Sequence, residues 1–298
     1  MHSSAPAPIS TPHLLPRHFL LALAVVAVWG SNFVVIKHGL NVMPPLLFAA
    51  LRFTLVFLPA AFFLKRPAVS WTNLMAYGLF IGAGQFGLLF IAMRGHISPG
   101  VASLVIQVQV FFTIFLSMRL TGERVRARQW IALALAATGI GVIAANTDGT
   151  TTLLGLALVV LAAFSWAAGN IVGRNAGKVN MLAYIVWSSL FAAPPLILLS
   201  LIVEGPAAIE AALRAADATT WAAVLWQTIG NSMFGYGAWA WLQSRYPAAT
   251  ITPMALLVPV FGMAASTLLI GESFPLWKGA AMALVMGGLA LNLLKRNP

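Results

Sequence analysis

The chain has 298 residues, of which 60% are apolar and only 8% are charged, and its mean hydropathy is +0.91. Soluble domains are roughly half apolar and a quarter charged, so this composition excludes a soluble protein and indicates an integral membrane protein. The chain has no cysteine, which excludes a disulfide scaffold, a thiolate metal site and a cysteine nucleophile. The net charge of +11 resides in short loops between apolar runs, where membrane topology explains it better than nucleic-acid binding.

Residues 1–17 are rich in Ser, Pro and His, and we interpret them as a disordered cytoplasmic tail. Ten apolar runs follow, each close to the roughly 20 residues that a helix needs to cross a bilayer. The predicted spans are 18–37, 45–64, 72–93, 98–118, 129–145, 153–173, 180–203, 219–242, 247–269 and 276–294. These runs are continuously apolar rather than alternating, which excludes a β-barrel. The predicted fold is an all-α membrane protein with ten transmembrane helices.

The distribution of Lys and Arg predicts the orientation, because basic residues are retained on the cytoplasmic side of a membrane. Twelve of the 17 basic residues fall on the side of the N-terminus, four fall on the opposite side, and Arg52 lies within a span. Both termini are therefore predicted to be cytoplasmic, in the inner membrane of a bacterial cell. An even number of spans agrees with this orientation.

The chain contains an internal repeat. Gly122-Glu123 and Gly271-Glu272 each precede an apolar helix, and a glycine follows each glutamate after sixteen residues, at Gly139 and Gly288. The two halves, 18–146 and 153–295, would each hold five helices, and because five is odd the second copy would be inverted in the membrane. Inverted repeats are typical of transporters. We expect the Gly-Glu pairs to cap helix ends rather than to bind substrate.

Several motifs resemble those of one transporter family. They are Trp29–Lys37 (WGSNFVVIK), Met43-Pro44-Pro45, Leu51-Arg52-Phe53, Ser98–Ser103 (SPGVAS) and Gly122-Glu123. The sequence resembles the EamA type of the drug/metabolite transporter superfamily over its whole length, and its first half is similar to bacterial exporters of amino acids and their metabolites. The resemblance implies a ten-helix exporter with a central cavity between the halves, built largely from helices 1, 3, 4, 6, 8 and 9.

Polar residues within the spans are the candidate substrate contacts, because polar atoms in a membrane usually face the bundle interior or a hydrated cavity. Spans one and six each place an aromatic residue and an amide on one face at helical spacing, and the third, fourth and eighth spans add amides. The predicted substrate-binding residues are Trp29, Asn32, Phe33, Gln85, Gln107, Trp166, Asn170, Gln227 and Asn231. The alternative role for such residues is hydrogen bonding between helices.

Three further polar or small-residue features receive structural interpretations. Gln107 and Gln109 would point about 200° apart on a regular helix, so we expect only one of them to line the cavity. The GxxxG pair Gly78 and Gly82 is typical of close helix contact. Arg52 lies about two turns inside its span, and we favour a side chain that reaches the outer surface or bonds a carbonyl over one that binds a substrate carboxylate.

The acidic residues all fall in loops or at helix ends, so no span carries a carboxylate that could couple transport to protons or cations. We therefore expect facilitated diffusion or exchange of an amino acid or similar metabolite, with the lipid bilayer as surroundings and no cofactor, no metal and no nucleic acid as partner. Enzyme motifs are lacking. Two alternatives stay open: transport of phosphorylated or nucleotide-linked metabolites or drugs, and a receptor or assembly subunit that transports nothing.

Overall fold

The computed structural model describes residues 14–121, 127–147, 149–246 and 248–293, and these residues form helices without a β-strand among them. The predicted all-α class is therefore confirmed, while Glu123, Asp148 and Pro247 lie outside the described residues. The helical segments are α1 (Pro16–Gly39), α2 (Pro45–Ala61), α3 (Trp71–Gly78), η1 (Leu79–Gly87), α4 (Leu88–Met93), α5 (Pro99–Val105), η2 (Ile106–Val108), α6 (Gln109–Thr121), α7 (Ala127–Ala145), α8 (Leu153–Asn175), α9 (Met181–Leu199), η3 (Ser200–Glu204), α10 (Pro206–Ala215), α11 (Ala218–Leu225), η4 (Trp226–Gly235), α12 (Tyr236–Arg245), α13 (Ala248–Ile251), η5 (Thr252–Leu256), α14 (Leu257–Ile270) and α15 (Leu276–Leu293).

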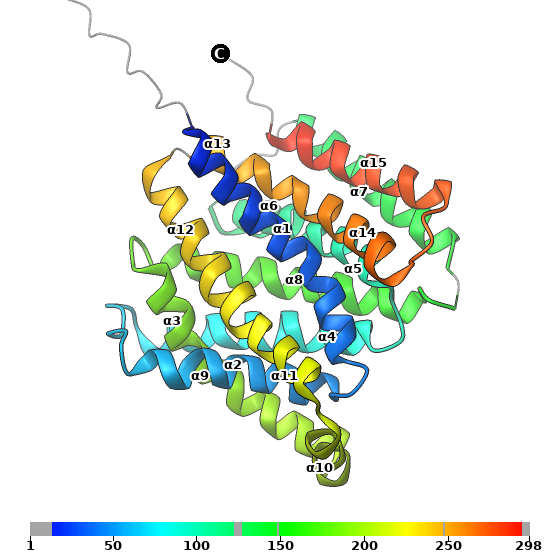
Figure 1. The fold of residues 1–298 in the computed structure, drawn as a ribbon. Coiled ribbons are helices and arrows are strands. Elements are labelled where there is room, and N and C mark those ends of the chain that lie inside the picture. The colour runs from blue at the N-terminus through cyan, green and yellow to red at the C-terminus, as the bar shows by residue number, and fades with distance from the viewer. Residues whose placement is uncertain (1–13, 122–126, 148, 247, 294–298) are drawn as a thin grey trace, which may run out of the picture.

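Seven helical runs of the described chain are long and apolar enough to cross a membrane, and two shorter apolar helices, Pro45–Ala61 and Leu276–Leu291, accompany them. The seven are Pro16–Gly39, Trp71–Met93, Pro99–Leu120, Ala127–Ala145, Leu153–Asn175, Met181–Glu204 and Thr252–Ile270. The count of ten spans stays a prediction. One element was not predicted: α10 carries an exposed ion pair between Glu210 and Arg214 and lies at the end of the molecule far from both chain ends (Figure 1).

Local sequence explains where many helices begin and end. The side chains of Ser70, Thr152, Asn180 and Asp217 each accept a hydrogen bond from the backbone N–H three residues further on, as N-cap residues do. Helices α1, α2, α5 and α10 begin with a proline in their first turn, where the missing N–H costs nothing. Gly271 ends α14 in the left-handed conformation, at φ +69°, as its predicted capping role requires.

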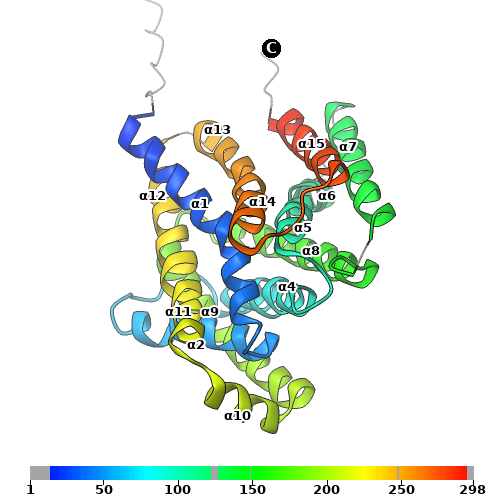
Figure 2. The same ribbon diagram turned by 45° about the vertical axis from the view of Figure 1, so that its right-hand side comes forward.

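Helices far apart in the sequence pack side by side. Helix α1 packs on α14, α2 packs on α9, and α7 packs on α15 along one edge of the molecule (Figures 1 and 2). The run Trp71–Met93 packs on α9 through Gly78 and Gly82, where an added Cβ would collide with the backbone of Ser188 and with Ala192. The predicted close contact of the GxxxG pair is therefore confirmed.

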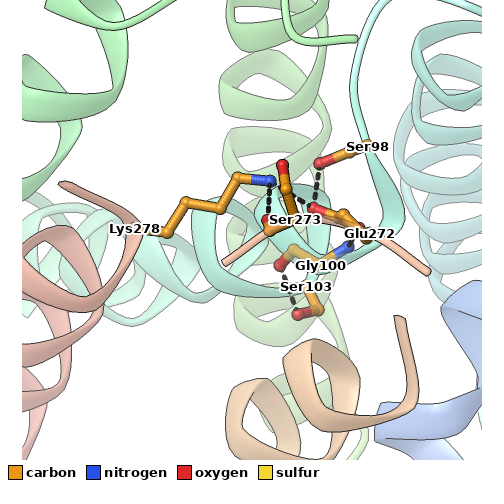
Figure 3. A network of polar contacts seen from close by, with 6 residues as sticks. All are labelled: Ser98, Gly100, Ser103, Glu272, Ser273 and Lys278. Carbon is orange, nitrogen blue, oxygen red and sulfur yellow. Dashed lines mark hydrogen bonds and ion pairs between the residues drawn. The ribbon is translucent and has the colours of Figure 1, made fainter. Parts of the chain in front are cut away.

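A partly buried polar cluster joins the loop before α15 to the start of α5. Glu272 accepts hydrogen bonds from the Ser98 hydroxyl at 2.5 Å and from the Gly100 backbone N–H at 3.0 Å (Figure 3). The Lys278 ammonium, which is 2% exposed, pairs with the same carboxylate at 2.8 Å and donates to the Ser273 carbonyl. Glu272 therefore caps α5, in the other half of the chain, rather than α15, which follows it in sequence. A negative charge at this end of a helix stabilises the N–H groups that have no partner within the helix.

Candidate functional site

A central cavity of about 330 Å³ lies between the two halves of the chain. Its wall is mostly apolar and aromatic, with amides as its main polar groups. The aromatic residues are Trp29, Phe33, Tyr77, Phe86, Trp166, Tyr236 and Trp239, and the polar ones are Asn32, Gln85, Gln107, Gln109, Asn170, Asn231 and Thr252. Sites for small molecules typically measure about 300–1,000 Å³ and combine apolar walls with a few polar groups, so this cavity has the size and chemistry of such a site.

Eight of the nine predicted contact residues line this cavity, and Gln227 does not. Gln227 is fully buried behind Asn32, and the two amides form a reciprocal pair. The Gln227 Nε2 donates to the Asn32 Oδ1 at 2.6 Å, and the Asn32 Nδ2 lies 3.4 Å from the Gln227 Oε1. The expectation that Gln227 faces the cavity is corrected: this side chain holds the Asn32 amide, which does face it.

Gln107 and Gln109 both line the cavity, which corrects the expectation that only one of them could. The reason is the 3-10 segment η2, which interrupts the helix at residues 106–108. In a 3-10 helix, which has three residues per turn, side chains two residues apart point about 120° away from each other. In a regular α-helix the same two side chains point in nearly opposite directions. The tighter winding therefore brings both amides toward one space.

Arg52 does not reach a surface, which corrects one of the two interpretations favoured for its side chain; the other, a bond to a carbonyl, is made with the amide of Gln227. It is 1% exposed, and its Nε donates to the Ser232 hydroxyl at 3.2 Å while its Nη1 donates to the Gln227 Oε1 at 3.0 Å. The guanidinium carbon lies 3.7 Å from the centroid of the Phe86 ring, a cation–π contact. Arg52, Gln227 and Asn32 thus form one polar chain that reaches the cavity wall.

A second polar group lies on α8, opposite this chain. The Asn170 Nδ2 donates to the Gln109 Oε1 at 2.9 Å and lies 3.4 Å from the Thr113 hydroxyl. One turn further along α8, Arg174 donates to Ser117 at 2.9 Å. Asn170 therefore lines the cavity and also bonds the neighbouring helix.

The Gln85 amide oxygen is buried without a hydrogen-bond partner. The side chain is 3% exposed, it lines the cavity, and its Oε1 is buried without a hydrogen bond. A buried acceptor without a partner costs about 1–3 kcal/mol, so such a group needs an explanation.

The irregular segments place these groups. Gln85 lies in the π-helical segment η1, and Gln227 and Asn231 lie in the π-helical segment η4. The Trp29 indole N–H donates to the backbone carbonyl of Asn231 at 3.3 Å. Gly235 faces that indole so closely that an added Cβ would collide with it. Short π-helical segments are frequent at functional sites.

Four aromatic residues of the wall were not predicted from the sequence: Tyr77, Phe86, Tyr236 and Trp239. Tyr236 follows Asn231 by five residues, which a regular α-helix would place about 140° apart, so regular helical spacing did not signal it; the π-helical segment η4 covers the residues between the two positions. The Trp29 ring lies 5.4 Å from the Tyr236 ring and 5.2 Å from the Trp239 ring, so the three form one aromatic wall. Within the ranges that the structure describes, no cluster of His, Asp or Glu could hold a metal ion.

The apolar helices and the central cavity are those of a multi-pass membrane transporter. The chain belongs to the EamA-like transporter family, whose model matches residues 17–145 and again residues 153–294. It is similar to a probable amino-acid metabolite efflux pump of Salmonella typhimurium, with 43% identity over 92% of this chain and 93% of that protein. A protein of the same description from Escherichia coli is 40% identical over 92% of this chain and 94% of its own length. A solved crystal structure shares the fold with a TM-score of 0.63 at 19% identity, covering 93% of this chain and 95% of that one.

Proposed function

We propose that this protein exports amino acids and related small metabolites from the bacterial cytoplasm by alternating access of two inverted five-helix repeats. The observation that carries the proposal is the central cavity, whose aromatic walls and neutral amides suit a zwitterion with a variable side chain. The two relatives described as probable amino-acid metabolite efflux pumps support the substrate class.

The placement of irregular helix supports the inverted repeat. A π-helical segment interrupts the third predicted span at Leu79–Gly87 and the eighth at Trp226–Gly235. A 3-10 segment interrupts the fourth at Ile106–Val108 and the ninth at Thr252–Leu256. Matching irregularities at corresponding positions of the two halves, next to the cavity, are what repeats around a substrate site would have.

Both termini are proposed to be cytoplasmic, because of the bias of Lys and Arg. The start of α1 and the end of α15 lie at the same edge of the molecule in both ribbon views, in agreement with an even number of spans (Figures 1 and 2). Of the acidic residues, Glu204, Glu210, Asp217 and Glu272 lie at helix ends, in the short helix α10 or in a loop, away from the cavity. Facilitated diffusion or exchange is therefore the proposed mode of transport.

The alternatives have weaker support. A phosphorylated substrate would need several cations near the cavity, and within the described chain Arg52 is the cation that approaches it. Membership in a transporter family speaks against a receptor or assembly subunit that moves nothing.

The test is uptake of labelled neutral, aromatic and charged amino acids into proteoliposomes, with and without an imposed proton gradient. Saturable flux that ignores the gradient is expected. Accumulation driven by the gradient would contradict the uncoupled mode, and absence of flux for every amino acid would overturn the substrate class. Protein-free liposomes and the Asn32→Ala variant serve as controls for leakage and for the site.

A further inference from the structure

Arg52 is a buried cation with neutral partners only. Its side chain is 1% exposed, and its hydrogen bonds go to a hydroxyl and to amides. Among the described residues, the two ion pairs join Lys278 to Glu272 and Arg214 to Glu210, so neither supplies a carboxylate to Arg52. A buried charge is normally paired, because the loss of its hydration costs several kcal/mol. The resting protein therefore holds a positive charge that lacks an anion.

The amide of Asn231 occupies the fork of this guanidinium. Its oxygen is assigned to the side facing Arg52, because only that orientation sets an acceptor against two donors. In that orientation the oxygen lies 3.1 Å from Nη1 and 3.0 Å from Nη2. The Asn231 oxygen thus accepts from both terminal nitrogens of Arg52 and occupies the position of a carboxylate in an arginine–carboxylate pair. The amide does not supply the negative charge of a carboxylate.

The same Asn231 lines the central cavity, so the fork is one side chain away from the space for substrate. A small second cavity, of about 10 Å³, lies directly beside Arg52. Tyr77, Phe86 and Tyr236 line both cavities and form the partition between them. Rotation of the Asn231 side chain would therefore join the guanidinium to the cavity without a change in the helices.

We propose that Arg52 recognises the carboxylate of the transported molecule, and that this carboxylate replaces the Asn231 amide oxygen in the guanidinium fork. The inference rests on the proposed function and makes its substrate class narrower: an acid group is required, whereas the amino group and the side chain contribute less. Arg is suited to this role because its planar fork matches a carboxylate in two hydrogen bonds, which a lysine ammonium cannot reproduce. Gln227 and Ser232 position the fork.

The first test uses the unaltered protein and three compounds that differ in charged groups. Thermal stability of the detergent-purified protein is measured with 3-phenylpropionate, which has only the acid, with phenethylamine, which has only the amine, and with L-phenylalanine. We expect the two acids to raise the melting temperature and the amine to leave it unchanged. In proteoliposomes, phenylalaninamide should compete with labelled phenylalanine at least about tenfold more weakly than phenylalanine itself, since charge-assisted bonds contribute about 1.5–3 kcal/mol.

The second test alters the fork. Asn231→Asp places a carboxylate of the same shape against Arg52, so this variant should fold at least as well as the wild type and bind 3-phenylpropionate at least about tenfold more weakly. Arg52→Gln should abolish the effect of the acid, and Arg52→Lys should restore part of it. If Arg52→Gln fails to fold, the wild-type comparison and Asn231→Asp decide the question.

The outcomes separate the two proposals. Equal competition by phenylalanine and phenylalaninamide, with phenylalanine transported, would overturn the role of Arg52 and leave the exporter intact. Stabilisation by 3-phenylpropionate that Asn231→Asp removes, without flux of any amino acid, would overturn the exporter and leave the carboxylate site intact. Acid binding that is unchanged in Asn231→Asp would also overturn the role of Arg52.

Discussion

Gly139 on α7 and Gly288 on α15 make equivalent contacts with each other's helix. Gly139 faces Ala281, Leu284 and Val285, which precede Gly288 by seven, four and three residues. Gly288 faces Ala132, Leu135 and Ala136, which precede Gly139 by the same three intervals. Contacts that are reciprocal in this way arise between antiparallel helices related by a local twofold axis. The sixteen-residue spacing from Glu to Gly in each half of the sequence therefore corresponds to a symmetric contact in space.

Substitution of these glycines should weaken the α7–α15 pair. In Gly288→Ala the new Cβ would lie 2.5 Å from the Ala132 carbonyl oxygen, and in Gly139→Ala it would lie 2.7 Å from a methyl of Val285. Because a side chain can move more easily than backbone, we expect Gly288→Ala to cost more, about 1–3 kcal/mol of unfolding free energy. Thermal unfolding in detergent would measure this. Gly287→Ala and Gly141→Ala, which have open space, are the matched controls, and an equal loss in them would contradict the explanation.

Gln85→Leu should separate binding from stability. The Gln85 oxygen is buried without a partner, so its removal should leave the melting temperature unchanged or raise it. If a substrate ammonium donates to this oxygen, the apparent affinity for transport should fall, but by less than the roughly tenfold loss expected without the carboxylate contact. Proteoliposome uptake of labelled phenylalanine measures the affinity. A loss of stability with unchanged affinity would mean that the amide serves packing alone.

Asn32→Ala and Asn170→Ala should both reduce flux but differ in stability. Asn32→Ala leaves the buried Gln227 amide without one of its partners, which costs about 1–3 kcal/mol, whereas Gln109 beside Asn170 is partly open to the cavity and can be hydrated. Melting temperature and uptake measured on the same preparations test this. Undiminished transport in both variants would rule out the proposed polar contacts.

Glu272→Gln should destabilise the protein far more than Glu210→Gln. The first substitution leaves Lys278 buried without its carboxylate, which typically costs about 3–5 kcal/mol, and removes the charged cap of α5. The second breaks an ion pair whose two side chains are 80% and 62% exposed, and such pairs contribute little. Unfolding midpoints of the two variants provide the comparison. Similar midpoints would show that the cluster in Figure 3 contributes no more than a surface pair.

The stability that the Asp217 cap contributes at the start of α11 should depend on pH in the acid range. Hydrogen bonds from the Thr220 hydroxyl and backbone, and from Thr219, lower the pKa of Asp217 to about 2. Because the folded pKa lies below the unfolded one, the cap stabilises fully above about pH 4 and is lost as the pH falls toward 2. The melting temperature of Asp217→Ala should therefore lie below that of the wild type at pH 5, and the difference should shrink as the pH falls to 2. A constant difference would mean that the carboxylate charge is not the cause.

The all-α class and eight residues of the cavity wall could be predicted from the sequence, because long apolar runs and polar residues within them are strong signals. Trp29, Asn32 and Phe33 share a face at 3.6-residue spacing, and that face does line the cavity. Gln227 and Arg52 were misjudged because a single sequence gives positions along a helix but not the neighbour that each face meets. Their partners lie 195 and 175 residues away in the chain, at Asn32 and Gln227.

The π-helical segments η1 and η4 change the direction in which side chains point along one helix. A π turn accommodates an additional residue, so side chains beyond it are displaced by roughly 100° around the axis relative to an uninterrupted α-helix. In the run Trp71–Met93, Gly78 and Gly82 face α9, whereas Gln85 and Leu89 face the cavity. Deletion of one residue within 79–87 would restore regular winding and would rotate one of these faces away from its target. The run Trp71–Met93 thus presents Gly78 and Gly82 to α9 and Gln85 to the cavity, although a regular helix would place these three positions on one face.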